Sequence, residues 1–271
     1  MSLPETEELI GPDGRLLRYC LYGPADGFPV ISHGGSPSSR WKRPAQLAAM
    51  EQSDLRQLVY DRPGYGGSTR QPGRTVADAV RDVQALAEAH GWAQFAIFGG
   101  SGGGPHALAC AALLPDQVTR CAVLSGIRPV RADPPPQESS LRPRLEAHAA
   151  EIMSKIDDGG PESPWEPGPP ARTDPDALAR LRATFLDGTD GWVDDSLAFA
   201  RPWGFDPATI TVPVGIWRGT ADTIVPAEHA EWLLSQIKNS QGHVYAGGHL
   251  PDAGVYHQIF KWLGSDEKVS L

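Results

Sequence analysis

Residues 95–105 read Phe-Ala-Ile-Phe-Gly-Gly-Ser-Gly-Gly-Gly-Pro, which sets Ser101 in a run of glycines between two different patterns. The apolar residues before the glycines are typical of a buried strand, and Pro105 opens a helical pattern that extends to Leu114. A sharp turn between a strand and a helix strains the backbone and brings neighbouring chain close, which favours glycine at the flanking positions. The stretch therefore predicts a strand, a tight turn at Ser101 and a helix.

A serine at such a turn is typical of a nucleophile elbow. The positive end of the following helix would favour an anionic intermediate at Ser101. The alternatives are a flexible glycine-rich loop and a phosphate-binding turn. A phosphate-binding turn would carry Gly-Lys-Ser or Gly-Lys-Thr, and a dinucleotide-binding fold would place its glycine turn after the first strand. Neither condition is met, so we interpret Ser101 as the candidate nucleophile.

The rest of the chain alternates short apolar runs with longer amphipathic ones, which is typical of a mostly parallel sheet covered by helices. We expect strands at residues 16–22, 29–32, 58–60, 95–98, 121–124, 214–217 and 242–245. We expect helices at residues 43–51, 76–90, 105–114, 227–236 and 255–263. A chain of 271 residues is short enough for one hydrophobic core, so the sequence predicts a single α/β fold.

The alternation is interrupted once, between about residues 128 and 206, where prolines are dense. Helical patterns at 141–156, 176–186 and 192–200 lie inside this segment. A disordered linker between two domains is the alternative, but the residues after it resume the strand pattern and are too few to bury a core of their own. We therefore expect a core of residues 1–127 and 207–271 that carries a helical, proline-rich lid at 128–206.

Two further side chains could activate Ser101, whose hydroxyl is a weak nucleophile without a base and a group that fixes the base's tautomer. Asp222 follows the expected strand 214–217, and His249 follows the expected strand 242–245. Both residues lie at carboxyl ends of strands, where open α/β sheets collect their ligand sites. The order Ser, Asp, His accompanies the nucleophile elbow. We expect His249 to be the general base and Asp222 to orient it.

Each of these residues has a purely structural alternative, because a loop aspartate before a helix is often an N-cap and a lone histidine is often a surface or core group. The rival bases are His243, inside an expected strand, and His257, inside an expected helix. The rival carboxylate, Asp252, is too close to His249 in sequence to come from a separate strand end. Spacing, chain order and position at strand ends together favour catalytic roles for Asp222 and His249.

An oxyanion requires hydrogen-bond donors, which are usually backbone N–H groups. One donor is expected at Gly102, directly after the candidate nucleophile. A second is expected in the loop after the strand 29–32, which reads His33-Gly34-Gly35-Ser36-Pro37. Either Gly35 or Ser36 would donate, and the sequence leaves that choice open. We interpret His33 as a hydrogen-bonding residue that shapes this loop.

These motifs together with residues 61–68, Asp-Arg-Pro-Gly-Tyr-Gly-Gly-Ser, resemble the α/β-hydrolase superfamily over nearly the whole chain except the lid. The resemblance implies a mostly parallel central sheet of about eight strands flanked by helices, with the lid inserted after the sixth strand. It also implies that Ser101 is acylated, that no metal or cofactor takes part and that residues 61–68 form a turn and scaffold. The oxyanion loop departs from the His-Gly-Gly-Pro-Gly motif of proline iminopeptidases at Ser36, and Gly102 stands where many members have a bulkier residue.

The expected function is hydrolysis of a small apolar ester or lactone through a Ser-His-Asp triad and an acyl-enzyme. The lid supplies Trp165, Trp192 and Trp203 as candidates for an apolar substrate pocket, although each could equally pack the lid onto the core. Aminopeptidase, carbon–carbon bond hydrolase and acyltransferase activities use the same triad and remain alternatives. A non-catalytic, hydrolase-like binding protein is a remote alternative. Dehalogenase and epoxide hydrolase chemistry would require a carboxylate in place of Ser101.

Composition narrows the partners and the compartment. The net charge of −9 and the pI near 5.3 argue against binding to nucleic acid, so a small-molecule substrate is the expected partner. No apolar stretch approaches the length of a membrane span and no signal peptide is visible. Cys20, Cys110 and Cys121 are expected to be free thiols, which together with the missing signal predicts a cytoplasmic location. The sequence does not predict an oligomeric state.

Overall fold

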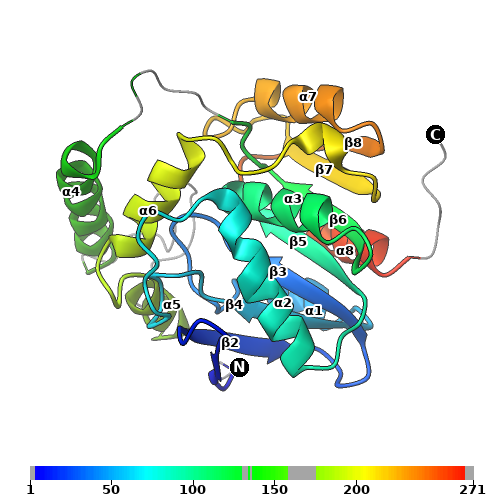
Figure 1. Cartoon of the computed structure of the whole chain (residues 1–271), viewed down its shortest axis with the longest axis horizontal. Coiled ribbons are helices and arrows are strands. Elements are labelled where there is room, and N and C mark those ends of the chain that lie inside the picture. Colours follow the sequence, from blue (N-terminus) through cyan, green and yellow to red (C-terminus); the bar gives the residue numbers. More distant parts are fainter. Residues whose placement is uncertain (1–3, 130–133, 135, 158–174, 266–271) are drawn as a thin grey trace.

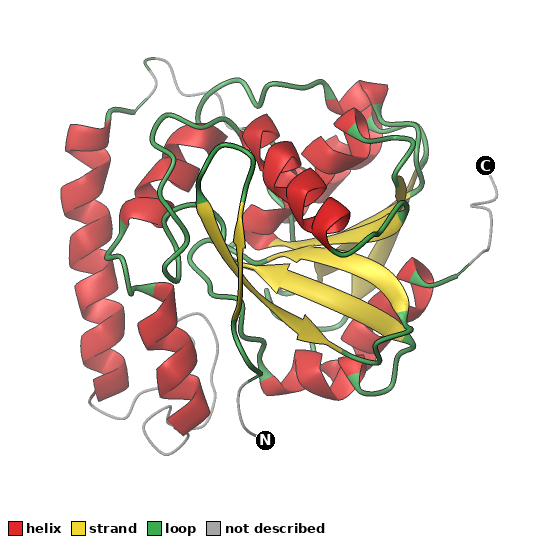
Figure 2. Ribbon diagram, turned by 60° about the horizontal axis from the view of Figure 1, so that its bottom comes forward, coloured by secondary structure: helices red, strands yellow, loops and turns green. Residues whose placement is uncertain are grey.

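The computed structural model describes residues 4–129, 134, 136–157 and 175–265, and its centre is a single sheet of eight strands in the order β1-β2-β4-β3-β5-β6-β7-β8 (Figures 1 and 2). The strands are β1 (Glu7–Ile10), β2 (Leu16–Tyr22), β3 (Phe28–His33), β4 (Leu55–Tyr60), β5 (Phe95–Gly100), β6 (Val118–Leu124), β7 (Val214–Gly219) and β8 (Ser240–Tyr245). The pairings of β2 with β1 and with β4 are antiparallel, and every other pairing is parallel. The predicted, mostly parallel sheet of about eight strands is confirmed.

Helices cover both faces of the sheet. The helices α2 (Ala79–Ala89), α3 (Gly104–Leu113) and α7 (Ala227–Gln236) pack on one face, and α1 (Pro44–Met50) and α8 (Ala253–Leu263) pack on the other. Successive side chains of β5 point to opposite faces of the sheet, and both faces are apolar. Phe95 and Ile97 belong to one core cluster, and Ala96 and Phe98 belong to the other. A strand buried on both faces reads as a continuous apolar run, which made β5 recognisable in the sequence.

The first strand was not expected from the sequence. β1 carries Glu7 and Glu8, lies at the edge of the sheet and exposes 64% of Ile10. It pairs with only one neighbour and buries little, so no apolar run marks it. β6 begins at Val118, three residues before the expected start. The prediction missed this part of the strand because the charged Arg120 interrupts the apolar pattern. In the structure the Arg120 guanidinium lies 5.0 Å from the Trp262 ring.

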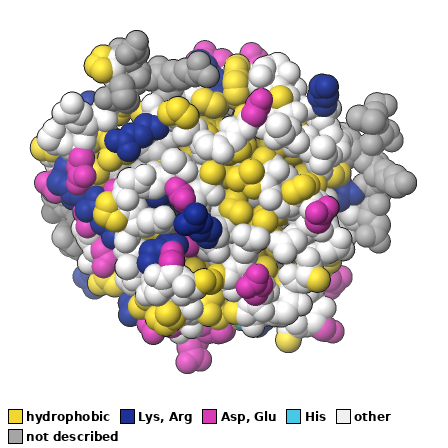
Figure 3. Space-filling view, viewed as in Figure 1, with side chains coloured by type: hydrophobic (Ala, Val, Ile, Leu, Met, Phe, Trp, Pro, Cys, Tyr) yellow, Lys and Arg dark blue, Asp and Glu magenta, His cyan; other side chains and the backbone are white. Residues whose placement is uncertain are grey.

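Among the described residues between β6 and β7, three α-helices lie together at one side of the sheet (Figure 1). They are α4 (Glu138–Asp157), α5 (Pro175–Thr184) and α6 (Asp190–Phe199), and they overlap the three helical patterns expected in this segment. Acidic and basic side chains intermingle over their outer surface (Figure 3), as in the pair Arg142–Glu138 at 2.6 Å. The division of the chain into a core and a lid stays a prediction. No described helix has the length and apolarity that crossing a membrane requires.

Candidate active site

Ser101 lies at the junction between β5 and α3, in a short 3-10 turn over Ser101–Gly103. Its φ angle of 51° is in the left-handed region, which costs a residue with a side chain about 1–3 kcal/mol. Close approach requires glycine at position 103, since a side chain at Gly103 would collide with the carbonyl oxygens of His33 and Gly34. The predicted strand, tight turn and helix are present, with Ser101 at the centre of the turn.

Asp222 and His249 come together at the carboxyl ends of β7 and β8. The Nδ1 atom of His249 and the Oδ2 atom of Asp222 are 2.9 Å apart. The other carboxylate oxygen of Asp222 accepts hydrogen bonds from the backbone N–H groups of Ile224 and Val225, at 2.9 and 3.0 Å. Burial alone would raise the pKa of Asp222, but the hydrogen bonds from His249 and Val225 hold that pKa below its usual value. Asp222 is therefore a fixed, ionised partner for the histidine near neutral pH.

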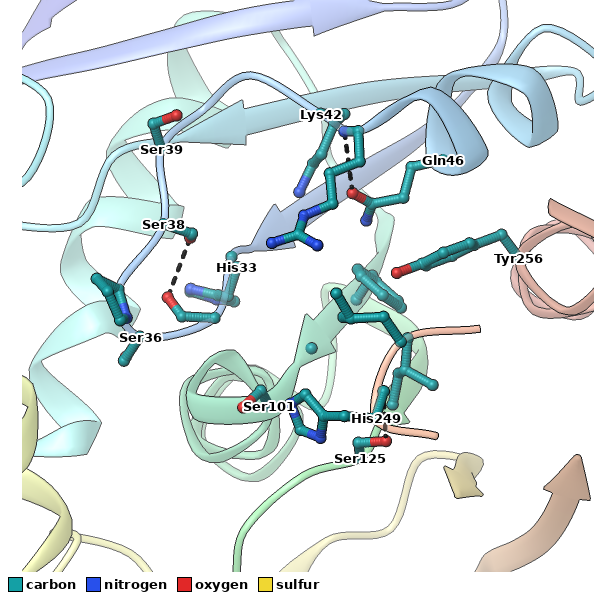
Figure 4. A pocket seen from close by; sticks show the side chains of 18 of the residues that line it. His33, Ser36, Ser38, Ser39, Lys42, Gln46, Ser101, Ser125, His249 and Tyr256 are labelled. Carbon is teal, nitrogen blue, oxygen red and sulfur yellow. Dashed lines mark hydrogen bonds between the residues drawn. The ribbon is translucent and has the colours of Figure 1, made fainter. Parts of the chain in front are cut away.

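Two hydroxyl groups fix the loop that carries His249 through hydrogen bonds to its backbone. Ser125 Oγ donates to the backbone carbonyl of His249 at 3.1 Å, and the Tyr245 hydroxyl donates to the same oxygen at 3.2 Å. Ser101 and His249 line one pocket, and Figure 4 shows their side chains next to each other. No direct hydrogen bond joins the two side chains, which is common before substrate binds because such bonds often tighten only in the complex.

The rival residues lie elsewhere. The ring of His243, on β8, stacks on Trp217 with centroids 4.2 Å apart. His257 lies inside α8, as expected. The Asp252 side chain accepts from the Val255 N–H at 3.0 Å and caps the start of α8. None of these three residues lines the pocket that contains Ser101.

The loop after β3 faces the elbow from across the pocket. A side chain built at Gly35 would lie 3.5 Å from the Ser101 Cβ, and one built at Gly102 would collide with the side chain of Ser36. Arg62 donates to the carbonyl oxygens of Gly34 and Gly35, at 2.5 and 2.9 Å. Because the N–H and C=O of a trans peptide point in opposite directions, the N–H groups of Gly35 and Ser36 point away from Arg62. Among the described residues neither N–H has a hydrogen-bond acceptor, so both remain candidate oxyanion donors.

His33 lies beneath this loop rather than in it. It is fully buried, and its Nδ1 atom is 3.2 Å from the hydroxyl of Tyr60. Burial, with the nearby His106 and Arg62, keeps the pKa of His33 well below its usual value, so the ring is neutral at neutral pH. The hydrogen bonds that shape the loop come instead from Arg62 and from Ser38, whose hydroxyl donates to the Gly35 carbonyl at 3.0 Å.

A buried charge cluster that sequence reasoning missed connects α6 to this loop. Asp195, on α6, is fully buried and binds Arg62 and Arg74, each at 2.6 Å, and the Tyr65 hydroxyl at 3.0 Å; it also accepts from the hydroxyl of Ser36. We call these five residues the Asp195 cluster. Burial alone would raise the pKa of Asp195, but Arg62 and Arg74 hold it well below its usual value, so the carboxylate is ionised. The only available signal was that Asp194 and Asp195 stand between the apolar pairs Trp192-Val193 and Leu197-Ala198 in the helical pattern.

The pocket beside Ser101 is a cavity of about 140 Å³ that both apolar and polar side chains line. The apolar side chains include Trp41, Phe98, Leu124 and Leu250. Two basic residues that the sequence did not single out, Lys42 and Arg43, also line it. Among the described residues, no three His, Cys, Asp or Glu side chains gather in the way that metal ligands do.

Two of the three tryptophans expected in the substrate pocket, Trp192 and Trp203, do not line it. Trp192 packs with Tyr65, Ala149 and Ile152 in a small cluster between the helices of the insertion and the loop after β4. Trp203 is 3% exposed and belongs to the main core. Neither side chain lines the pocket, because each instead fills a packing contact between the inserted segment and the rest of the protein. Trp165 lies outside the described residues.

The family model described as alpha/beta hydrolase fold matches residues 29–156. A bifunctional esterase/perhydrolase from Acinetobacter calcoaceticus is 28% identical over 87% of this chain and 89% of its own. A non-heme chloroperoxidase from Streptomyces lividans is 32% identical over 120 residues, which is 44% of each chain.

Solved structures resemble the whole chain. The enol-lactonase from Burkholderia xenovorans LB400 superposes with a TM-score of 0.72 at 20% identity, covering 94% of this chain and 97% of its own. An esterase from Exiguobacterium antarcticum gives a TM-score of 0.72 at 18% identity, covering 96% and 98%. At these identities the similarity concerns the fold alone.

Proposed function

Because this chain belongs to the α/β-hydrolase superfamily, we propose that it is a serine hydrolase that cleaves a small carboxylic ester or lactone through an acyl-enzyme. The observation that carries the proposal is the 2.9 Å contact between His249 and Asp222 at the pocket where Ser101 stands in a left-handed turn. A base that is oriented by a carboxylate beside a strained serine is the arrangement that nucleophilic catalysis requires.

In the proposed reaction His249 Nε2 takes the proton of Ser101 as the serine oxygen attacks the substrate carbonyl. The N–H of Gly102 and that of Gly35 or Ser36 stabilise the oxyanion that forms. His249 then gives the proton to the leaving alcohol, and the acyl group remains on Ser101. His249 then takes a proton from a water molecule, which attacks the acyl-enzyme carbonyl. The acid is released as His249 returns the proton to Ser101. Asp222 keeps the proton of the neutral imidazole on Nδ1, so that Nε2 is free to accept.

The inserted helices are proposed to form a lid over this site. Their supporting contact is the Asp195 cluster, through which α6 binds the side chain of Ser36 in the oxyanion loop. The apolar character expected of the substrate is supported by Trp41, Phe98 and Leu124 rather than by Trp192 or Trp203. The alternatives that use the same triad differ in the bond that is cleaved, and a comparison of ester with amide substrates separates them.

The proposed location is the cytoplasm. The three cysteines are buried and are not joined in a disulfide. Burial raises the pKa of the Cys20 thiol to about 11, so this thiol stays protonated and unreactive at neutral pH. Unpaired cysteines accord with a reducing compartment.

Labelling with a fluorophosphonate probe tests the proposed nucleophile. We expect the wild-type protein to be labelled and the Ser101→Ala variant to remain unlabelled, because the probe reacts only with an activated serine. Ser125→Ala is the matched control: it removes another hydroxyl from the same pocket, and Tyr245 still donates to the His249 carbonyl, so this variant should still be labelled at Ser101. Labelling that persists in Ser101→Ala would refute the assignment. Turnover of aminoacyl amides above that of p-nitrophenyl esters would favour an aminopeptidase.

A further inference from the structure

The wall of the pocket opposite Ser101 carries positive charge. Lys42 and Arg43 line the pocket, and no described Asp or Glu side chain lines it. Lys42 follows the oxyanion loop and is only 5% exposed. Figure 4 shows the Lys42 side chain across the pocket from Ser101 and His249. The charge is therefore separated from the reacting atoms by the width of the cavity.

Neither cation has an acidic partner in the part of the chain that the structure describes. The only hydrogen bond of Lys42 there is from its backbone N–H to the Tyr22 hydroxyl, and its ammonium group forms no ion pair. The Arg43 guanidinium forms no ion pair with a described residue either. Other buried cations are paired: Arg40 binds Asp61 and Arg62 binds Asp195. The acids near Lys42 are thus already occupied.

An unpaired ammonium group in a buried position is unfavourable without a compensating anion. Burial, and then the charge of Arg62, lower the pKa of Lys42 to about 8, and Asp61 opposes this only in part. The lysine is still protonated at neutral pH. A negatively charged ligand group would offset the cost of burying it, through a charge-assisted hydrogen bond.

We propose that this pocket binds an acyl group that ends in a carboxylate and that Lys42 and Arg43 bind this carboxylate. The preferred substrates are then monoesters or lactones of small carboxylate-bearing acids. The reaction in this statement rests on the proposed serine hydrolase function. The carboxylate site itself rests on the two unpaired cations and on the apolar side chains, such as Phe98 and Leu124, that line the same pocket. These side chains would contact the methylene groups while the ester carbonyl lies at Ser101.

The test uses two esters that share a six-carbon acyl chain, mono-p-nitrophenyl adipate with a terminal carboxylate and p-nitrophenyl hexanoate with a terminal methyl. We expect wild-type kcat/KM to be higher for the adipate, after subtraction of spontaneous hydrolysis. Lys42→Met should lower the adipate-to-hexanoate ratio of kcat/KM about 10- to 100-fold, the loss expected for one charge-assisted hydrogen bond. Arg43→Gln should lower the ratio in the same direction.

The control is Lys238→Met, which removes the same charge from an exposed position just before β8, at the edge of the sheet opposite the site, and should leave the ratio unchanged. A wild-type protein that does not prefer the adipate would overturn the proposal. So would an equal loss on both esters in Lys42→Met and Arg43→Gln, since that pattern indicates only a structural role.

The dependence on pH gives an independent measurement. The charged groups near Lys42 are Asp61 and Arg62 in the loop after β4, His33 on β3 and its own neighbour Arg43. Above neutral pH the arginines stay charged, Asp61 stays ionised and His33 stays neutral, so Lys42 is the group among them that titrates near pH 8. We expect kcat/KM for the adipate to fall as the pH rises through about 8, because Lys42 loses its proton, whereas the hexanoate profile lacks this decrease. Identical profiles for the two esters would contradict the proposal.

A binding experiment separates this proposal from the proposed reaction. In the Ser101→Ala background, which cannot be acylated, calorimetry should show that monomethyl adipate binds more tightly than methyl hexanoate. Adding Lys42→Met should remove the difference. If Ser101 is never labelled but monomethyl adipate still binds through Lys42, the proposed hydrolase function is refuted and the proposed carboxylate site is supported. If Ser101 is labelled and monomethyl adipate binds no better than the neutral ester, the proposed carboxylate site is refuted and the proposed hydrolase function is supported.

Discussion

The Asp222→Asn variant is expected to hydrolyse p-nitrophenyl hexanoate with kcat about 10⁴-fold below that of the wild type. The reason lies in the two oxygens of Asp222. Oδ1 accepts from the N–H groups of Ile224 and Val225, which fixes the orientation of an asparagine amide with its oxygen toward them. The amide NH₂ would then face His249 Nδ1 in place of Oδ2. A donor in that position holds the imidazole proton on Nε2, so the ring cannot accept the proton of Ser101.

The measurement is kcat at saturating substrate, with a thermal melt to show that the variant is folded. Asp252→Asn is the matched control, because Asp252 caps α8 through the Val255 N–H and asparagine is an equally good cap. Its kcat should equal that of the wild type. A kcat for Asp222→Asn within tenfold of the wild type would transfer the orienting role to another group.

The elements around Ser101 could be predicted because local sequence determines them. Gly103 is required by the close approach of His33 and Gly34, and a buried strand on one side and a helical pattern on the other fix the position of the turn. Asp222 and His249 could be found by the same rule, since each follows a parallel strand and parallel strands end at one edge of the sheet. The edge strand β1 shows the limit of this reasoning, because it buries too little to leave an apolar pattern.

The pocket could not be predicted in the same way. Lys42 and Arg43 precede a proline and a helix, a position where basic side chains are usually solvated. In the structure, Lys42 is nevertheless buried. Tryptophans in the inserted segment fit a pocket or a packing contact equally well, and the choice between these depends on which face of α6 meets the loop after β4. In the structure that face carries Trp192 toward Tyr65. Long-range packing of this kind leaves no local signal.

The same packing makes Asp195 the position where a single substitution should cost the most stability. Asp195→Ala is expected to lower the free energy of unfolding by about 3–5 kcal/mol, the range for breaking a buried ion pair by removal of one partner. The loss arises because Arg62 and Arg74, each 3% exposed, would keep their charges without a carboxylate. The measurement is urea-induced unfolding, followed by circular dichroism. The control is Asp13→Ala, whose exposed pair with Arg15 at 2.7 Å should contribute less than about 1 kcal/mol.

The dependence on pH distinguishes this electrostatic cause from a simple packing defect. The pKa of Asp195 is lowered by folding, so its contribution to stability is fully present above the pKa of the unfolded chain, about 4, and decreases as the pH falls below that value. The difference in unfolding free energy between the wild type and Asp195→Ala should therefore be constant from pH 7 to about pH 5 and narrow at lower pH. A constant difference at all pH values would mean that lost packing, rather than two unpaired arginines, destabilises the variant. Because Arg62 also holds the carbonyls of Gly34 and Gly35, the electrostatic outcome would mean that the inserted helix and the oxyanion loop depend on one another for their position.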